Sequence, residues 1–393
     1  MKTSTVVRLA CVNALGFSAS TVMPLWLGGI AKELGMPPSF AGAAVFAQLG
    51  GAAIFNLATP FLFRAVPLLR LARIAFAIAA AAYLAAMAHA PNIFIAACFV
   101  CGSALGIVLN VTNRLMGSMD HVQKGYAIFV MLEIVVAASL FLTSARLIDR
   151  VGLFAVFPVV SVSAASGVLL LWRLPIGALL AGRPATPSDP TVGEPGEPAV
   201  RGRAVLTLAS FAAFFVGQAA LNSFMPTIGT ASGLTALQAS QLIGFGMPCG
   251  FAGALLARAV GERVRPVLPV TLVVILLAST ALLLAAAPSR GTFIIGVVVL
   301  AITTLFSLPY FFAQLGAFDR HGRYTSFGPA MMLVGLAVGP SSAVLLQANF
   351  GLAAVGFFAA GLLLAGGIGF ATSTTRIRVP TSRHGALHQP PGA

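Results

Sequence analysis

One acidic residue, Glu133, lies in the middle of a long apolar stretch of this sequence. A charge at mid-bilayer costs about 2.5 to 3.5 kcal/mol on insertion scales, so an unpaired carboxylate there is expected to face a wet cavity or to be protonated. Tyr126 and Ser144 fall on the same helical face as Glu133. The sequence predicts Glu133 as a proton-coupling residue on a cavity-lining face. The alternative is a neutral Glu that serves helix packing alone.

A second set of residues carries amide or hydroxyl groups inside other apolar stretches. Several of them recur at intervals of four or eight residues, which places each pair on one face of a helix. Such side chains can hydrogen-bond a small molecule in a cavity, or they can join neighbouring helices. The residues predicted to bind substrate are Asn13, Thr21, Asn110, Asn113, Tyr126, Gln218, Asn222, Tyr310 and Gln314.

The sequence contains no constellation that would carry catalysis. It has no paired carboxylates, no histidine cluster, no phosphate-binding loop and no nucleophile beside a base. We therefore expect no enzyme activity, no metal site and no cofactor, with a proton gradient as the source of energy. The cysteines lie in apolar stretches and are interpreted as small buried side chains, including the pair spaced as Cys98-x-x-Cys101.

The composition indicates which structure must position these residues. Of the 393 residues, 59% are hydrophobic and only 8% are charged, and the mean hydropathy is +0.98. Soluble domains have about 25% charged residues, so the sequence predicts an all-α membrane protein. The apolar stretches are long enough to cross a bilayer as helices. The twelve predicted spans are 9–30, 39–60, 71–90, 93–113, 126–147, 153–174, 204–226, 236–257, 267–287, 292–314, 326–347 and 352–372.

Basic residues predict the orientation of the spans, because positively charged loops resist translocation. With the N-terminus inside, 19 of the 23 Lys and Arg residues fall on the cytoplasmic side. We expect a multi-pass protein of the inner (plasma) membrane with both termini cytoplasmic. The net charge of +14 comes from these loops, and no block of like charge indicates nucleic-acid binding.

Composition also divides the chain. Residues 175–203 are rich in proline and glycine and are predicted to be a disordered cytoplasmic linker. This linker separates an N-terminal six-helix bundle, residues 1–174, from a C-terminal six-helix bundle, residues 204–373. Residues 374–393 are predicted to be a disordered cytoplasmic tail.

The two halves contain similar short motifs in the same order, which favours an internal repeat. Met23-Pro24 late in the first span matches Met225-Pro226 late in the seventh. Arg64-Ala65-Val66 matches Arg258-Ala259-Val260. A segment after the fourth span that contains Asp120 matches a segment after the tenth that contains Asp319. The sequence thus predicts two pseudo-symmetric six-helix bundles.

In this arrangement the sequence resembles the major facilitator superfamily (MFS). The family's usual second–third loop motif, Gly-x-Leu-x-Asp-Arg-x-Gly-Arg, is matched here only by the arginines Arg64 and Arg258, without the Asp. The resemblance implies the MFS fold, small-molecule transport by alternating access, and a pathway lined by the first, fourth, seventh and tenth helices. It also implies loop or gating roles for Arg64, Arg258, Asp120 and Asp319.

A further motif is ambiguous. The proton-antiporter subgroup of that family has Gly-x-x-x-Gly-Pro in its fifth helix, whereas here Gly335, Gly339 and Pro340 place it in the eleventh. Close packing or a bend accounts for the motif without a coupling role. Separately, Pro24, Pro226 and Pro309 are predicted to kink their helices.

The absence of basic residues well inside the spans constrains the cargo, because anions are usually paired with an intramembrane cation. We predict a monomeric, proton-coupled exporter of neutral or cationic amphipathic compounds or metabolites, in which proton and cargo compete for Glu133. The alternative is uptake of a neutral nutrient by symport or uniport. A membrane receptor or enzyme without transport is a remote alternative.

Overall fold

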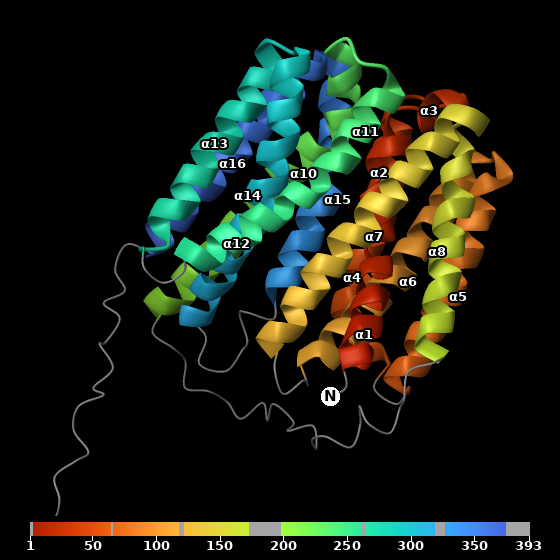
Figure 1. Ribbon diagram of the computed structural model, residues 1–393, viewed down its shortest axis with the longest axis horizontal. Coiled ribbons are helices and arrows are strands. Elements are labelled where there is room, and N and C mark those ends of the chain that lie inside the picture. The colour runs from red at the N-terminus through yellow and green to blue at the C-terminus, as the bar shows by residue number, and fades with distance from the viewer. Residues whose placement is uncertain are drawn as a thin grey trace, which may run out of the picture.

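A computed structural model of the protein describes residues 3–63, 66–117, 122–172, 198–260, 264–318 and 327–374. Throughout these ranges the secondary structure is helical (Figure 1). Twelve helices are long and apolar enough to cross a membrane, and they confirm all twelve spans predicted from hydropathy. The predicted fold class is therefore correct.

The first six spans are built from the helices between Thr3 and Trp172. Short 3₁₀ turns extend two of the spans at the end of the molecule opposite the N-terminus. The elements are α1 (Thr3–Gly16), α2 (Ser18–Leu27), α3 (Ile30–Glu33), α4 (Ser39–Leu62), α5 (Leu68–Ala85), η1 (Ala86–Ala88), α6 (Pro91–Gly117), α7 (Val122–Val151), η2 (Leu153–Ala155) and α8 (Val156–Trp172).

The second six spans follow in the same alternating up-and-down order. They comprise α10 (Pro198–Ala231), α11 (Ala236–Gly246), η3 (Met247–Cys249), α12 (Gly250–Val260), α13 (Val267–Ala286), α14 (Arg290–Ala317), α15 (Gly328–Phe350) and α16 (Leu352–Thr374).

The start of α10 corrects one predicted boundary. The linker was predicted to extend to residue 203, but residues 198–203 already belong to α10. Proline is favoured in the first turn of a helix, where its missing N–H is not needed, and Pro198 begins this one. The rest of the predicted linker, from 175 to 197, and the tail beyond Thr374 lie outside the described residues.

Two of the spans are interrupted near their middle. The first is divided at Phe17, whose carbonyl oxygen accepts hydrogen bonds from the hydroxyls of Ser20 and Thr21 at 2.9 and 3.0 Å. The eighth is divided by η3, which contains Pro248 and so lacks one backbone donor. The prolines predicted to cause kinks lie elsewhere, inside the uninterrupted helices α2, α10 and α14.

Glycines allow the helices to approach closely within each half. In the first half, Gly102 and Gly106 of α6 face the backbone of α4, and a Cβ at either position would clash with a carbonyl oxygen of that helix. In the second half, Gly335 and Gly339 of α15 face α10 in the same way. Close packing therefore accounts for the glycine motif of the eleventh span.

The two halves meet mainly through three pairs of helices: α4 with α15, α7 with α11, and α2 with α10. Two of these contacts lie toward the end of the molecule away from the N-terminus, whereas Leu333, near the start of α15, packs with Ala53 of α4 and Leu109 of α6 farther toward the other end. Ser341 bonds the backbone of Gly42, and Gly244 lies against Leu142. Figure 1 shows the same arrangement, with the two groups of helices closer together near α3 and α11 than where α1 begins.

Candidate functional site

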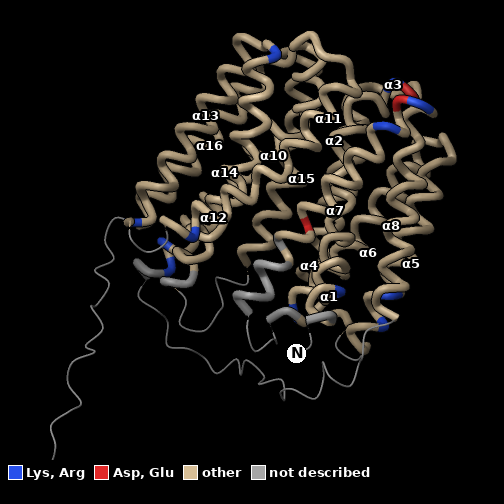
Figure 2. The backbone as a smooth tube through the Cα atoms, in the orientation of Figure 1, with Lys and Arg blue, Asp and Glu red and all other residues tan. Residues whose placement is uncertain are grey.

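Glu133 lies in the first half of α7 and is half-buried. Figure 2 shows basic residues gathered toward the two ends of the helices and one acidic position about midway along them. Among the described residues, the other acidic side chains are Glu33 in α3 and Asp149 near the end of α7, both exposed. Glu133 is therefore the acidic group, within the described ranges, that lies at the level of the membrane interior.

No described residue forms a hydrogen bond or an ion pair with Glu133. Its helix packs against α1, α2, α8 and α11, and more weakly against α6. The cations on these neighbouring helices are Arg8 on α1 and Arg114 on α6, and neither forms an ion pair with Glu133. A carboxyl group in this setting has no fixed partner among the described residues, which suits a group that must gain and lose a proton.

The predicted stripe of Tyr126, Glu133 and Ser144 is accessible only in part. Ser144 is completely buried and its hydroxyl has no partner in the structure. The nearby Leu142 packs against Gly244 of α11, so this end of α7 is closed by the second half of the molecule. The prediction that Ser144 faces an open cavity is therefore wrong in this conformation. The side chain of Tyr126 lies outside the described residues.

The amides of the first half mostly join helices to one another. The hydroxyl of Thr112 on α6 donates to Asn13 Oδ1 on α1 at 2.7 Å. Asn110 Nδ2 donates to the carbonyl oxygen of Asn56 on α4 at 2.8 Å, and Asn56 Nδ2 donates to the carbonyl oxygen of Gly106 at 3.3 Å. Asn13 and Asn110 therefore form hydrogen bonds between helices, as the packing alternative predicts.

Two further predicted residues of the first half differ from these. Thr21 bonds the backbone of Phe17 one turn earlier, so its hydroxyl is engaged within the first span. Asn113 is half-buried and has no hydrogen bond to a described residue. Asn113 is thus the amide of α6 whose polar group is accessible and unpartnered in the described part of the molecule.

In the second half, Gln218 and Asn222 are one turn apart on α10 but differ in environment. Gln218 is buried, and its amide nitrogen donates to the hydroxyl of Thr304 on α14. Asn222 is exposed, whereas the residues on either side of it, from Ala219 to Met225, are buried. Asn222 is therefore an exposed amide on a helix that packs against helices of both halves.

Tyr310 and Gln314 lie one turn apart on α14 and are both buried. Within the described part of the chain, neither the hydroxyl of Tyr310 nor Nε2 of Gln314 has a hydrogen-bond partner. The ring of Tyr310 packs against Phe306, with ring centroids 5.3 Å apart. Both side chains are therefore enclosed by the protein in this conformation.

The loop residues are described only in part. Arg258 is exposed in the last turn of α12 and makes no hydrogen bond to a described residue. The other loop or gating residues predicted from the family resemblance, Arg64, Asp120 and Asp319, lie outside the described residues.

Sequence reasoning missed the partners Asn56, Thr112 and Thr304. The bonds of Thr112 to Asn13 and of Gln218 to Thr304 join residues 99 and 86 positions apart. Polar side chains in apolar spans were a visible signal for each partner, but their pairing depends on how the helices are rotated against one another. The predicted binding and coupling residues that are at least partly exposed and have no hydrogen-bond partner among the described residues are thus Glu133, Asn113 and Asn222.

Comparison with sequence-family models finds no match, and comparison with curated protein sequences finds none either. Solved structures do match over almost the whole chain. The nucleoside transporter NupG is 12% identical with a TM-score of 0.74, and the match covers 96% of this chain and 100% of NupG.

Two other structures are similar at the same identity of 12%. The POT family transporter PepTSo has a TM-score of 0.68 over 94% of this chain and 97% of its own. A D-xylose-proton symporter has a TM-score of 0.67 over 94% of this chain and 96% of its own. At this level of identity the likeness is one of fold. In this chain the fold consists of twelve spans within the described residues, in two six-helix groups that meet along a seam of three helix pairs. The chain therefore has the fold of these solved transporter structures.

Proposed function

We propose that this protein is a secondary active transporter that moves a small molecule across a membrane by alternating access, with transport coupled to protons. The observation that carries the proposal is Glu133, a half-buried carboxyl group at mid-helix without a partner among the described residues. The fold supports it, since the similar solved structures are those of transporters.

The coupling follows from the cost of burying charge. A carboxylate that becomes enclosed in an apolar site without a cation is costly, whereas the protonated group is neutral. Glu133 can therefore pass through an occluded state when it carries a proton or when a cationic or hydrogen-bonding substrate neutralises it. If proton and substrate compete for the same carboxyl group, the two move in opposite directions, which gives antiport.

The distribution of charge supports the choice of cargo and direction. Within the described spans, Arg8 and Arg114 lie toward the ends of their helices, and no cation pairs with Glu133. This setting favours neutral or cationic amphipathic compounds over anions. We assign proton-coupled efflux as the leading function of a monomer.

The same charges support a proposed orientation in the membrane. The N-terminal end, which holds most of the basic residues, faces the cytoplasm of an inner (plasma) membrane, and both termini are cytoplasmic. The seam between the halves then closes the outer side, and the accessible Glu133 and Asn222 are reached from the cytoplasm. A periplasm-dependent reporter inserted at Ser289 should be active, and the same reporter fused after Thr374 should be inactive.

A second candidate function is uptake of a neutral nutrient by proton symport. It is favoured by the named activities of similar structures, which include the D-xylose-proton symporter and the fucose:proton symporter FucP of E. coli. Amides such as Asn113 and Asn222 would suit a hydroxyl-rich cargo as well as an amphipathic one.

A single assay separates these functions. Compounds are first screened by thermal shift of the purified protein at two pH values, because a ligand stabilises the state it binds. A stabilising compound is then added outside proteoliposomes that contain a pH-sensitive dye and carry no initial gradient. Antiport raises the luminal pH, symport lowers it, and uniport leaves it unchanged. Uptake of the compound without a pH change would contradict proton coupling, and the absence of any uptake would contradict transport of that compound.

A further inference from the structure

We propose that the start of α5 and the end of α8 form a binding site for the headgroup of an anionic phospholipid. Arg70 and Arg73 bind its phosphate, and Trp172 packs beside it. The two helices are antiparallel neighbours, so α5 begins where α8 ends. The site lies on the lipid-facing surface of the first bundle and includes no residue of the candidate transport site, so it is independent of the proposed function.

Helices α5 and α8 pack against each other along most of their length (Figure 1). Near the middle, the hydroxyl of Ser161 on α8 donates to the carbonyl oxygen of Ala80 on α5 at 2.9 Å. Farther along, Gly167 lies against the ring of Phe76, so close that a Cβ at Gly167 would clash with the ring. The outward faces of the two helices therefore adjoin each other.

Each outward face is apolar along the helix and ends in a residue suited to the membrane interface. Exposed residues recur every three or four positions, which places them on one face of each helix. On α5 they are Arg70, Ile74, Ala77, Ile78, Ala81 and Leu84, and on α8 they are Val162, Ala165, Leu169 and Trp172. In a membrane-spanning fold the apolar residues contact acyl chains. Arg70 and Trp172 then lie at the level of the headgroups, where both residue types are favoured.

Arg73 is held between the two helices by contacts with α8. Its Nη2 donates to the carbonyl oxygen of Leu171 at 3.1 Å, and its guanidinium lies over the ring of Trp172, 5.5 Å from the centroid. Because Nε of Arg73 is buried, the donors that a ligand can reach are those of the Nη groups. The contacts orient a half-buried guanidinium and leave it further donors, and arginine binds phosphate in a bidentate geometry.

The positive charge at this place has no acidic partner within the described ranges. Glu33 and Asp149 lie at the opposite end of the molecule, and Glu133 lies midway. Figure 2 shows basic but no acidic positions where α5 begins. Arg70 and Arg73 are one turn apart, a spacing at which like charges repel each other. A bound anion offsets this repulsion, and at a lipid-facing surface that anion is the phosphate of a phospholipid.

The headgroup must carry a net negative charge. A choline or ethanolamine group would bring its own cation close to the two arginines, whereas phosphatidylglycerol has no cation. The adjoining apolar faces of α5 and α8 favour a lipid over a soluble phosphate, because only a lipid also contacts those faces.

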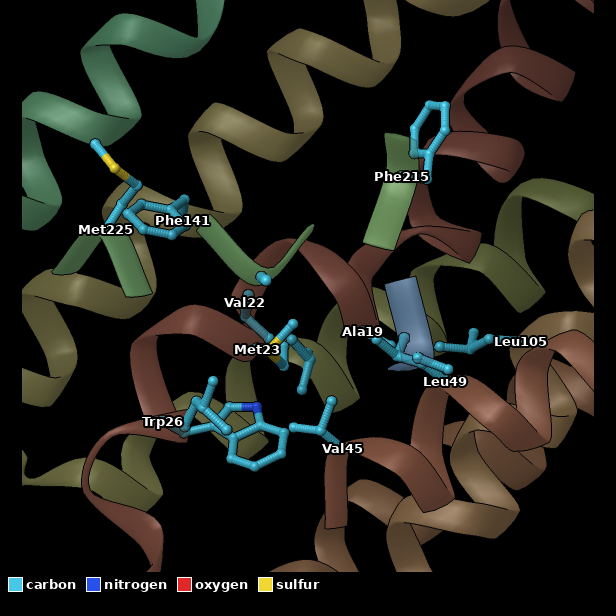
Figure 3. Packing of buried hydrophobic residues seen from close by; sticks show 14 of the residues in the cluster. Ala19, Val22, Met23, Trp26, Val45, Leu49, Leu105, Phe141, Phe215 and Met225 are labelled. Carbon is cyan, nitrogen blue, oxygen red and sulfur yellow. The ribbon is translucent and has the colours of Figure 1, made fainter. Parts of the chain in front are cut away.

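Trp172 provides a direct test in the unaltered protein. The chain has two tryptophans, and Trp172 is 70% exposed whereas Trp26 is 1% exposed within the packed core (Figure 3). The protein is placed in phosphatidylcholine vesicles with rising fractions of phosphatidylglycerol that carries bromine near the head of its acyl chains. Bromine quenches tryptophan fluorescence on contact, and brominated phosphatidylcholine gives the reference. The affinity at Trp172 should be about tenfold higher for phosphatidylglycerol, as expected for charge-assisted hydrogen bonds.

Equal quenching by the two lipids would overturn the proposal, including the case in which an acidic residue of the chain itself neutralises the arginines. Inorganic phosphate at constant ionic strength should not remove the preference, because the acyl chains also hold the lipid. Loss of the preference in millimolar phosphate would assign the arginines to a soluble anion and would overturn the lipid site.

Variants locate the preference. Arg70→Gln should reduce it to near one, and the side chain of Arg70 is exposed with no hydrogen bond to a described residue, so the fold should not depend on it. Arg201→Gln is the matched control, because it removes the same charge from an exposed position near the start of α10, at the same end of the molecule. It should keep the preference.

An equal fall in the Arg70→Gln and Arg201→Gln proteins would indicate a general attraction between basic residues and anionic lipid, and would overturn a specific site. Trp172→Phe should abolish the difference between the two brominated lipids, since only the buried Trp26 then remains as a reporter. A difference that persists in this variant would place the bound lipid elsewhere.

Discussion

The hydroxyl of Ser341 on α15 donates a hydrogen bond to the carbonyl oxygen of Gly42 on α4, at 3.0 Å, across the seam between the two halves of the molecule. The residues are 299 positions apart. A Cβ at Gly42 would lie 3.2 Å from the carbonyl oxygen of Ser341 and 3.4 Å from Val344, so even a methyl group would require a shift of a few tenths of an ångström, and a larger side chain would separate the helices. Closure of the molecule at this end therefore depends on a small residue.

Gly42→Leu should open that end. The leucine cannot fit between α4 and α15, so the seam separates, and the effect should extend to the α7–α11 pair. In a chain without the native cysteines, Leu142→Cys and Gly244→Cys report this separation through their disulfide, because the two positions are in contact in the closed seam. We expect Gly42→Leu to reduce cross-linking.

The control for this experiment is Gly361→Leu, since a side chain at Gly361 meets no atom within 4 Å. It should leave the yield of the disulfide unchanged. Equal cross-linking in the Gly42→Leu and Gly361→Leu chains would mean that the two helix pairs of the seam separate independently or that the seam tolerates the larger residue.

Glu133→Gln should abolish pH-gradient-dependent transport while leaving the fold intact. The amide keeps the size and polarity of the side chain but cannot exchange a proton in the physiological range. The measurement is luminal pH in proteoliposomes on addition of a transported compound. Asp149→Asn, at the exposed end of the same helix, is the matched control and should behave like the unaltered protein.

The stability of the Glu133 variants separates coupling from packing. Loss of expression in Glu133→Ala together with normal pH-dependent transport in Glu133→Gln would show that the residue serves packing. Unchanged pH dependence in a well-folded Glu133→Gln protein would remove Glu133 from the mechanism.

Gly339→Ala should destabilise the second bundle. A Cβ there would clash with the carbonyl oxygen of Val216 and lie 2.9 Å from the amide nitrogen of Ala220, both backbone atoms that cannot move aside without shifting α10. Overpacking of this kind costs about 1–3 kcal/mol. The Tm in detergent should fall for Gly339→Ala and should not fall for Gly361→Ala, where the methyl group meets open space. A Tm as high as that of the Gly361→Ala protein would show that α15 and α10 are less tightly packed than this contact requires.

Asn110→Ala and Asn222→Ala should affect different properties of the protein, stability in the first case and transport in the second. Asn110 donates to the backbone of Asn56 at 2.8 Å, and its loss should lower the Tm, since interhelical bonds in membranes contribute about 0.6–1.7 kcal/mol. Asn222 is exposed and forms no hydrogen bond to a described residue, so its substitution should leave the Tm unchanged and reduce transport of the compound found by screening. Normal transport by Asn222→Ala would remove Asn222 from the predicted substrate site.

Much of the architecture was predictable because it depends on local properties of the chain. A run of about 20 apolar residues satisfies its own backbone only as a helix in lipid, so each span could be identified without knowledge of its neighbours. The isolated Glu133 was visible for the same reason, as a charge within such a run. The positive loops predicted an orientation that the described residues do not test, and the linker boundary was misplaced at Pro198 because helix and linker both accept a proline there.

The roles of the polar residues were decided by the tertiary structure. Asn13 and Asn222 were indistinguishable in sequence as amides in apolar spans. In the structure, Asn13 accepts a hydrogen bond from Thr112 inside a bundle, whereas the side chain of Asn222 on α10 is exposed. The difference arises from the rotation of each helix against partners far away in the chain, which hydropathy does not encode. The same holds for Gly42 and Ser341. The sequence by itself determined which segments cross the membrane, and packing between helices decided which of their polar groups are left free to act.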